Sequence, residues 1–137
     1  MKCHLYANGE LVGWAELIHT DPSMGYVSGP FYPNESYKKI QPVIREHHLC
    51  DGTLGEKDEK RLKEVQAHIS ALRMVAITEN GEVLDPIAGV HIVDFSEELP
   101  EEPYLLEILG LSHEVFARLF PAATQDYYNH SWTKDVS

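Results

Sequence analysis

The segment from Asp21 to Pro33 constrains the fold more than any other part of the sequence. Three prolines and two glycines alternate there with large apolar and aromatic residues. Proline fixes one backbone dihedral and lacks an N–H donor, whereas glycine reaches conformations that other residues avoid. A strand is predicted over Tyr26–Tyr32, and it must be an edge, bulged or finished at Pro30. Gly29 predicts a point where another backbone or an aromatic ring comes close.

Two Asn-Gly dipeptides, at residues 8–9 and 80–81, predict two β-hairpins, because both residues of a tight hairpin turn need positive φ. Both faces of segment 11–19 carry apolar side chains, which predicts a central strand that is covered on both sides. Residues 104–111 alternate as a strand does but also suit a helix, and both remain open. The other strands expected from the apolar patterns are residues 3–7, 26–32, 74–77 and 88–95.

One long amphipathic helix is predicted over Leu54–Ala71, where apolar residues recur at spacings of three and four. Thr53 and Glu56 match the capping-box pattern before it. A second helix is expected over His113–Phe120, and Pro42 should break the helical segment after residue 33 into a kink or two short pieces. The fold class expected is therefore α+β, with residues 1–137 as a single domain and a polar tail that frays from about residue 124. Its centre is a mainly antiparallel five- to six-stranded sheet with two to three helices packed on it.

The net charge of the chain limits the classes of partner that it can bind. Eleven basic and 22 acidic residues give a formal net charge of −11, which repels nucleic acid and anionic membranes. The same field attracts a basic protein partner, although solubility alone also explains an acidic surface. No apolar run approaches the ~20 residues of a membrane span, and no secretory signal is seen, so we expect a cytoplasmic protein.

The proline-glycine segment also carries a family resemblance. The pattern Asp-Pro-x-Met-Gly, with Gly29, Phe31 and Pro33 after it, resembles one found in small bacterial proteins of unassigned function, and it covers about a tenth of the chain. Some such proteins are similar in size and acidity to the immunity proteins that neutralise secreted toxins. The resemblance implies a binding protein and transfers no catalytic residue.

The densest group of chemically active residues is His47-His48-Leu49-Cys50-Asp51. Imidazole and thiolate are zinc ligands, so His47, Cys50 and His68 are the candidates for a metal site. Cys50 with His47 or His48 as its base is the candidate for a thiol nucleophile. Adjacent histidines on a helix diverge by about 100°, so at most one of them can join Cys50 at a single ion. The sequence shows no oxyanion hole or orienting partner for a thiol nucleophile. Histidines that complement the helix dipole are the simpler interpretation.

Two further groups of residues are candidates for binding. The aromatic residues Tyr26, Phe31 and Tyr32 form either a ligand platform, an apolar patch for a homodimer, or the lid of the core. The loop residues Glu97, Glu98, Glu101 and Glu102 are expected to be an exposed acidic patch. We therefore expect a non-catalytic acidic binding or adaptor protein, without a cofactor, that recognises a basic protein partner. The alternative is a small metal-dependent or thiol enzyme centred on residues 47–51.

Overall fold

The sheet that organises this chain is entirely antiparallel and has eight strands. The computed structural model describes the backbone of residues 1–136 and the side chains of residues 1–130. The strands are β1 (Lys2–Ala7), β2 (Glu10–Glu16), β3 (His19–Asp21), β4 (Tyr26–Pro33), β5 (Val75–Thr78), β6 (Val83–Leu84), β7 (Val90–Asp94) and β8 (Tyr104–Ile108). The helices are η1 (Glu35–Lys39, a 3₁₀ helix), α1 (Gln41–Cys50), α2 (Glu59–Ala71), α3 (His113–Leu119) and α4 (Pro121–Val136).

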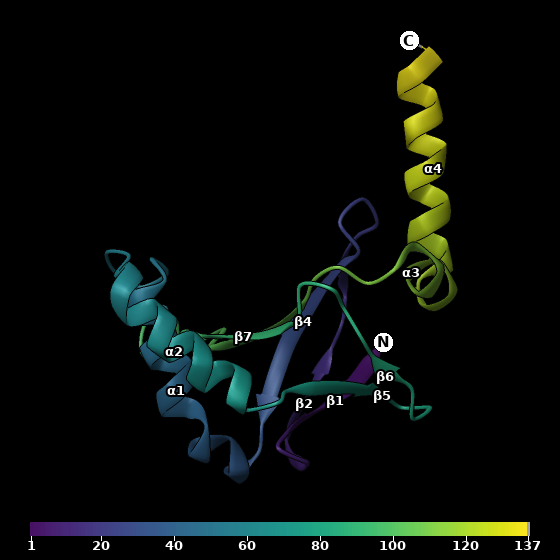
Figure 1. Cartoon of the computed structure of the whole chain (residues 1–137). Helices are drawn as coiled ribbons and strands as arrows, with labels where there is room; N and C mark the ends of the chain where they lie inside the picture. The colour runs from purple at the N-terminus through teal and green to yellow at the C-terminus, as the bar shows by residue number, and fades with distance from the viewer. Residues whose placement is uncertain (137) are drawn as a thin grey trace.

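The predicted α+β class and antiparallel sheet are confirmed, but there are more elements than expected. Eight strands replace the predicted five or six, because segment 11–19 divides into β2 and β3, β6 is only two residues long, and residues 104–108 form a strand. Four α-helices are described rather than two or three, since the tail expected to fray is drawn as the helix α4 (Figure 1). None of the described helices is long and apolar enough to cross a membrane.

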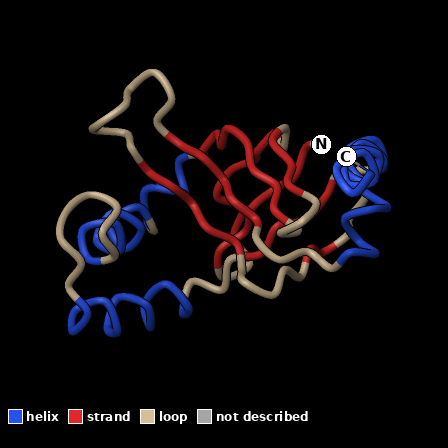
Figure 2. The backbone as a smooth tube through the Cα atoms, turned by 90° about the horizontal axis from the view of Figure 1, so that it is seen from above, coloured by secondary structure: helices blue, strands red, loops and turns tan. Residues whose placement is uncertain are grey.

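Strand β4 joins the two parts of the sheet. The strand order is β6-β5-β1-β2-β4-β8-β7, and β3 also pairs with β4. The C-terminal half of β4 pairs with β2, whereas its N-terminal half pairs with β3 on one side and with β8 on the other. The sheet therefore curls at β4, with α1 and α2 at one end and α3 and α4 at the other (Figure 2).

Gly29 and Pro30 lie where β2 passes into β3. A side chain at Gly29 would overlap the carbonyl oxygen of Glu16, so the approach of another backbone predicted from the sequence is confirmed. Pro30 pairs with Leu105 of β8. Ser28, two residues earlier in β4, accepts a hydrogen bond from the Ile18 N–H at 2.9 Å, so the backbone groups of Pro30 also point toward β2 and β3 and away from β8. The Pro30 nitrogen therefore points to the break between β2 and β3. No strand pairs with β4 at this break, so the lack of an N–H removes no inter-strand hydrogen bond. Proline is tolerated inside a central strand because of this break.

The core lies on one face of the curled sheet. Alternate residues of β1, Cys3, Leu5 and Ala7, are buried, as the strand period requires. Tyr37 and Ile44 cover this face from the η1–α1 segment, and Phe116 covers it from α3. The first hairpin turns at Asn8 and Gly9 with φ of 50° and 78°, as predicted.

The long helix begins later than predicted. Helix α2 starts at Glu59, and the Asp58 side chain caps it by accepting a hydrogen bond from the Arg61 N–H at 3.1 Å. Gly52 has φ of 95°, which ends the preceding helix region and leaves residues 51–58 as a loop. The break expected at Pro42 occurs as two pieces, since η1 ends at Lys39 and Pro42 lies in the first turn of α1.

Candidate functional site

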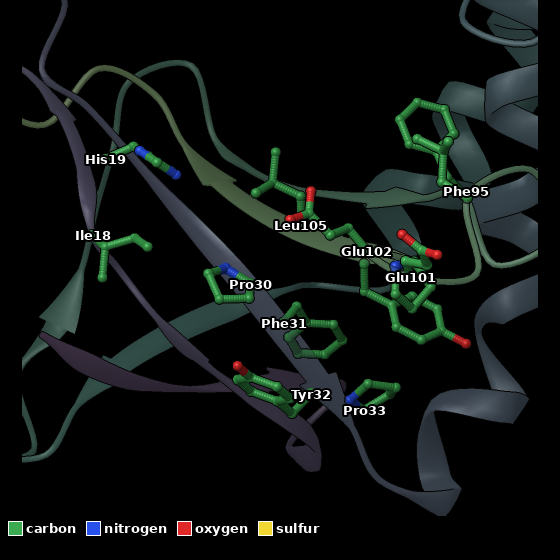
Figure 3. A pocket seen from close by; sticks show the side chains of 13 residues that line it. Ile18, His19, Pro30, Phe31, Tyr32, Pro33, Phe95, Glu101, Glu102 and Leu105 are labelled. Atoms are coloured by element: carbon green, nitrogen blue, oxygen red, sulfur yellow. The ribbon is translucent and has the colours of Figure 1, made fainter.

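A groove lined mainly by apolar and aromatic side chains opens beside the middle of β4. We call it the aromatic groove, and its volume is about 760 Å³. It is bounded by the β2–β3 junction, by β4, and by the loop that joins β7 to β8 (Figure 3). Its lining residues are Ile18, His19, Pro30, Phe31, Tyr32, Pro33, Phe95, Leu99, Glu101, Glu102, Pro103, Tyr104 and Leu105.

Aromatic packing fixes the walls of the groove. The Tyr32 ring stacks on Trp14 with centroids 4.4 Å apart, and the Lys2 ammonium lies 4.5 Å from the centroid of the same tryptophan. On the other face of β4, Phe31 is buried and packs edge-to-face against Tyr104. Such pairs stabilise by about 0.5–1.5 kcal/mol beyond the area they bury, so the walls are held in place without a ligand. Ile18, Tyr32 and Leu99 nevertheless keep about half of their surface exposed.

Two carboxylates supply the charge of the groove. Glu101 and Glu102 are exposed, lie across the groove from Ile18 and His19 in Figure 3, and make no ion pair with another described residue. The lining contains no lysine or arginine. Backbone hydrogen bonds hold the loop that carries them, including the bond of 2.7 Å from the Phe95 N–H to the Pro103 oxygen.

Only some of the residues that we proposed for binding from the sequence lie in the groove. Phe31, Tyr32, Glu101 and Glu102 all line the aromatic groove. Tyr26 lies outside it and donates its hydroxyl to Glu107 Oε2 at 2.8 Å.

The other two acidic binding candidates already form ion pairs within the protein. Glu97 and Glu98 both form ion pairs with Arg45 of α1, the first at 2.8 Å and the second at 2.5 Å. They are therefore less available to a partner than Glu101 and Glu102.

A buried carboxylate that the sequence analysis did not predict lies next to the groove. Asp94, at the end of β7, has no exposed surface. It accepts hydrogen bonds from the Tyr37 hydroxyl at 2.6 Å, the Gln41 amide at 3.0 Å and the Ser96 N–H at 2.9 Å. Burial raises the pKa of Asp94, but the hydrogen bonds from Ser96, Tyr37 and Gln41 outweigh it and hold the pKa below the ordinary value.

Helix α1 binds the open edge of β7 through its side chains. Arg45 donates to the Asp94 carbonyl oxygen at 2.9 Å, and the Asp94 N–H donates to His48 Nε2 at 3.0 Å. Two side chains thus satisfy the backbone groups that a neighbouring strand would otherwise bind. The spacing of Gln41, Arg45 and His48 by four and three residues places them on one face of α1, a polar signal that the sequence analysis did not use.

The hydrogen bond from Asp94 also fixes the tautomer of His48. Because Nε2 accepts, a neutral ring must carry its proton on Nδ1. Burial lowers the pKa of His48 below its ordinary value, which keeps the ring neutral at pH 7. Nδ1 is thus an N–H donor, and no other described residue accepts from it.

The three proposed metal ligands do not form one cluster among the described residues. Potential ligand atoms of His47, His48 and Asp51 lie within 4.8 Å of one another, a group that omits Cys50 and the exposed His68. A metal on Nδ1 of His48 would need a lone pair there, which its tautomer does not provide. Cys50 is only 1% exposed, so its sulfur is closed to a substrate.

The other thiol is equally enclosed. Cys3 lies in the core, and burial raises its pKa to about 11, which leaves it protonated and unreactive at neutral pH. Neither cysteine lines the aromatic groove. No protein-family model, curated protein or solved structure matches this chain, so its geometry alone carries the functional assignment.

Proposed function

We propose that this chain is a non-catalytic binding protein whose aromatic groove receives a segment of a basic protein partner. One observation carries the proposal: the groove is lined by apolar and aromatic surface, and its only carboxylates, Glu101 and Glu102, have no cation beside them. A partner segment with apolar side chains next to lysine or arginine is complementary to both features.

The net charge of −11 supports the same kind of partner. A negative field accelerates the approach of a cationic protein, and the contacts in the groove then set its orientation. The acidic loop is suited to this role because Arg45 already neutralises Glu97 and Glu98, while Glu101 and Glu102 stay exposed at the groove.

The test uses a defined probe, a fluorescein-labelled peptide of sequence Lys-Lys-Phe-Leu-Lys-Lys with blocked ends. Two companion peptides separate its features: one replaces Phe-Leu by Gly-Ser, and the other replaces every lysine by glutamine. Fluorescence anisotropy gives the affinity of each peptide at low and at physiological ionic strength. We expect the parent peptide to bind tightest, and its affinity to fall as salt rises.

Matched variants distinguish the effect of the groove carboxylates on binding from the effect of the net charge. Both E101Q/E102Q and E64Q/E79Q raise the net charge by the same amount, but Glu64 and Glu79 are exposed residues outside the groove. An exposed ion pair contributes about 0.5–1 kcal/mol in good geometry, so loss of two pairs should weaken binding about five- to thirtyfold. E64Q/E79Q should change it less than about twofold. Equal effects of the two double variants would refute the groove and leave only a long-range field.

A further inference from the structure

The aromatic groove is the largest of three adjoining hollows. One neighbour, of about 480 Å³, shares Leu99, Glu101 and Glu102 with it. The other, of about 440 Å³, shares Pro33 and Tyr104 with it and reaches η1. The surface open to a partner therefore continues past the groove in two directions, which suits an extended segment of several residues rather than a single side chain.

The strands around the groove give such a segment little edge to join. Binding as an added strand needs unpaired N–H and C=O groups along a strand edge. Strand β4 has β2 and β3 on one side and β8 on the other, β8 lies between β4 and β7, and β3 is only three residues long. Pro33, which lies beyond the pairing with β8, has no N–H. Recognition in the groove therefore depends on side chains.

Two tyrosine hydroxyls in the lining have no partner among the described residues. Those of Tyr26, Tyr37 and Tyr128 form hydrogen bonds, whereas those of Tyr32 and Tyr104 form none. A partner that covers these hydroxyls must offer them acceptors, because a buried donor without one is costly. The carbonyl groups of an α-helix are already bonded within the helix, whereas a polyproline II segment makes no internal hydrogen bonds. Its carbonyl oxygens are thus available to both tyrosines.

The aromatic surface and the charge of the groove suit the same kind of segment. Tyr32 stacks on Trp14, with ring centroids 4.4 Å apart, and keeps 45% of its surface exposed. Aromatic-lined grooves bind polyproline II segments well, because such a chain is already ordered and loses little conformational entropy on binding. Glu101 and Glu102 in the same lining favour a lysine or arginine beside the prolines.

We propose that the segment received by the aromatic groove is proline-rich and binds as a polyproline II helix, with a lysine or arginine placed against Glu101 and Glu102. This assignment rests on the proposed function, which requires apolar and basic side chains but leaves the conformation of the segment open. Tyr32 and Tyr104 donate their hydroxyls to carbonyl oxygens of the segment. A proline ring packs on the exposed face of Tyr32.

Three blocked, fluorescein-labelled peptides of equal length test the conformation. The parent is Lys-Lys-Pro-Leu-Pro-Pro-Leu-Pro-Lys-Lys, a second peptide has alanine in place of every proline, and a third has glutamine in place of every lysine. Fluorescence anisotropy should show the parent binding at least about fivefold tighter than either companion, because alanine removes the ordered conformation and glutamine removes the charge. Equal or tighter binding of the alanine peptide would overturn the proposal.

Three variants test the two hydroxyls. Tyr32→Phe and Tyr104→Phe keep the rings but remove the donors, and the control is Tyr127→Phe, at an exposed residue of α4 outside the groove. Each groove variant should weaken the parent peptide about two- to tenfold, the effect of one hydrogen bond, whereas Tyr127→Phe should change its affinity less than about 1.5-fold. Unchanged affinity in both groove variants would contradict the proposal.

NOEs between the proline rings of the bound parent peptide and the ring of Tyr32 place the segment directly. We expect them in the complex, and NOEs to other surfaces alone would overturn the proposal. If the parent peptide does not bind while Lys-Lys-Phe-Leu-Lys-Lys does, the polyproline conformation is refuted and the proposed function stands. If neither peptide binds, the proposed function fails as well.

Discussion

Removal of the Tyr37 hydroxyl tests whether a buried network joins α1 to the sheet. Tyr37 is 1% exposed and donates to Asp94, which has no exposed surface, at 2.6 Å. Hydrogen bonds to charged groups contribute about 1.5–3 kcal/mol, and no water replaces the hydroxyl in a buried site. Tyr37→Phe should therefore lower the free energy of unfolding by about 2 kcal/mol. With a urea m-value of about 2 kcal/mol/M, the midpoint falls by about 1 M.

Tyr104→Phe is the matched control. Its ring centroid lies 5.5 Å from that of Tyr37, and its hydroxyl makes no hydrogen bond with another described residue. It should change stability by no more than about 0.5 kcal/mol. Urea unfolding at pH 7, followed by circular dichroism, compares the two variants with the unaltered protein. If Tyr37→Phe unfolds at the same urea concentration as Tyr104→Phe, Asp94 does not depend on Tyr37 and the network is misassigned.

Two further predictions concern Gly29 and His48. Gly29→Ala places a methyl group on the Glu16 carbonyl oxygen, so it should lower the free energy of unfolding by more than about 3 kcal/mol or prevent folding. The control is Gly55→Ala, whose methyl group meets no atom within 4 Å and should change the melting temperature little. Comparable melting temperatures for the two variants would show that β4 does not need glycine there. Burial lowers the pKa of His48 in the folded state, with smaller effects of Asp51, His47, Asp94 and Arg45. Below the unfolded-state pKa of about 6.5, the imidazole of residue 48 is protonated in the unfolded chain but stays neutral in the folded chain. The contribution of His48 to the free energy of unfolding is therefore complete above pH 6.5. It declines as the pH falls toward the folded-state pKa, by up to about 1.4 kcal/mol per pH unit. Measured from pH 7.5 to 5, the free energy of unfolding should show this decline in the unaltered protein and a smaller decline in His48→Gln. Equal slopes of unfolding free energy against pH would contradict the lowered pKa of His48.

Local patterns predicted the parts of the fold that depend on neighbouring residues. The Asn8-Gly9 turn, the central position of β2 and the close approach at Gly29 all follow from chemistry within a few residues. The start of α2 was misplaced because Thr53 and Glu56 imitate a capping box, whereas Gly52 and the Asp58 cap decide the boundary. Two competing caps within six residues of sequence differ by little free energy.

Non-local contacts explain what the sequence could not supply. Residues 104–108 became a strand because they pair with both β4 and β7, which no local period shows. Tyr37 and Asp94 are 57 residues apart in the chain, so their hydrogen bond cannot be read from either segment. The groove was partly foreseen, since Tyr32 and Glu101 were both binding candidates. That they line one groove depends on the curl of the sheet at β4.

The central claim is that a basic segment binds in the aromatic groove, and backbone amide shifts test it most directly. The blocked Lys-Lys-Phe-Leu-Lys-Lys peptide is titrated into the ¹⁵N-labelled protein, and the shifted amides are placed on the structure. We predict that they gather at residues 18–19, 31–32, 99 and 101–105, which line the groove. Shifts at exposed acidic residues outside the groove, such as Glu64 and Glu79, with residues 99 and 101–105 unchanged, would contradict the account.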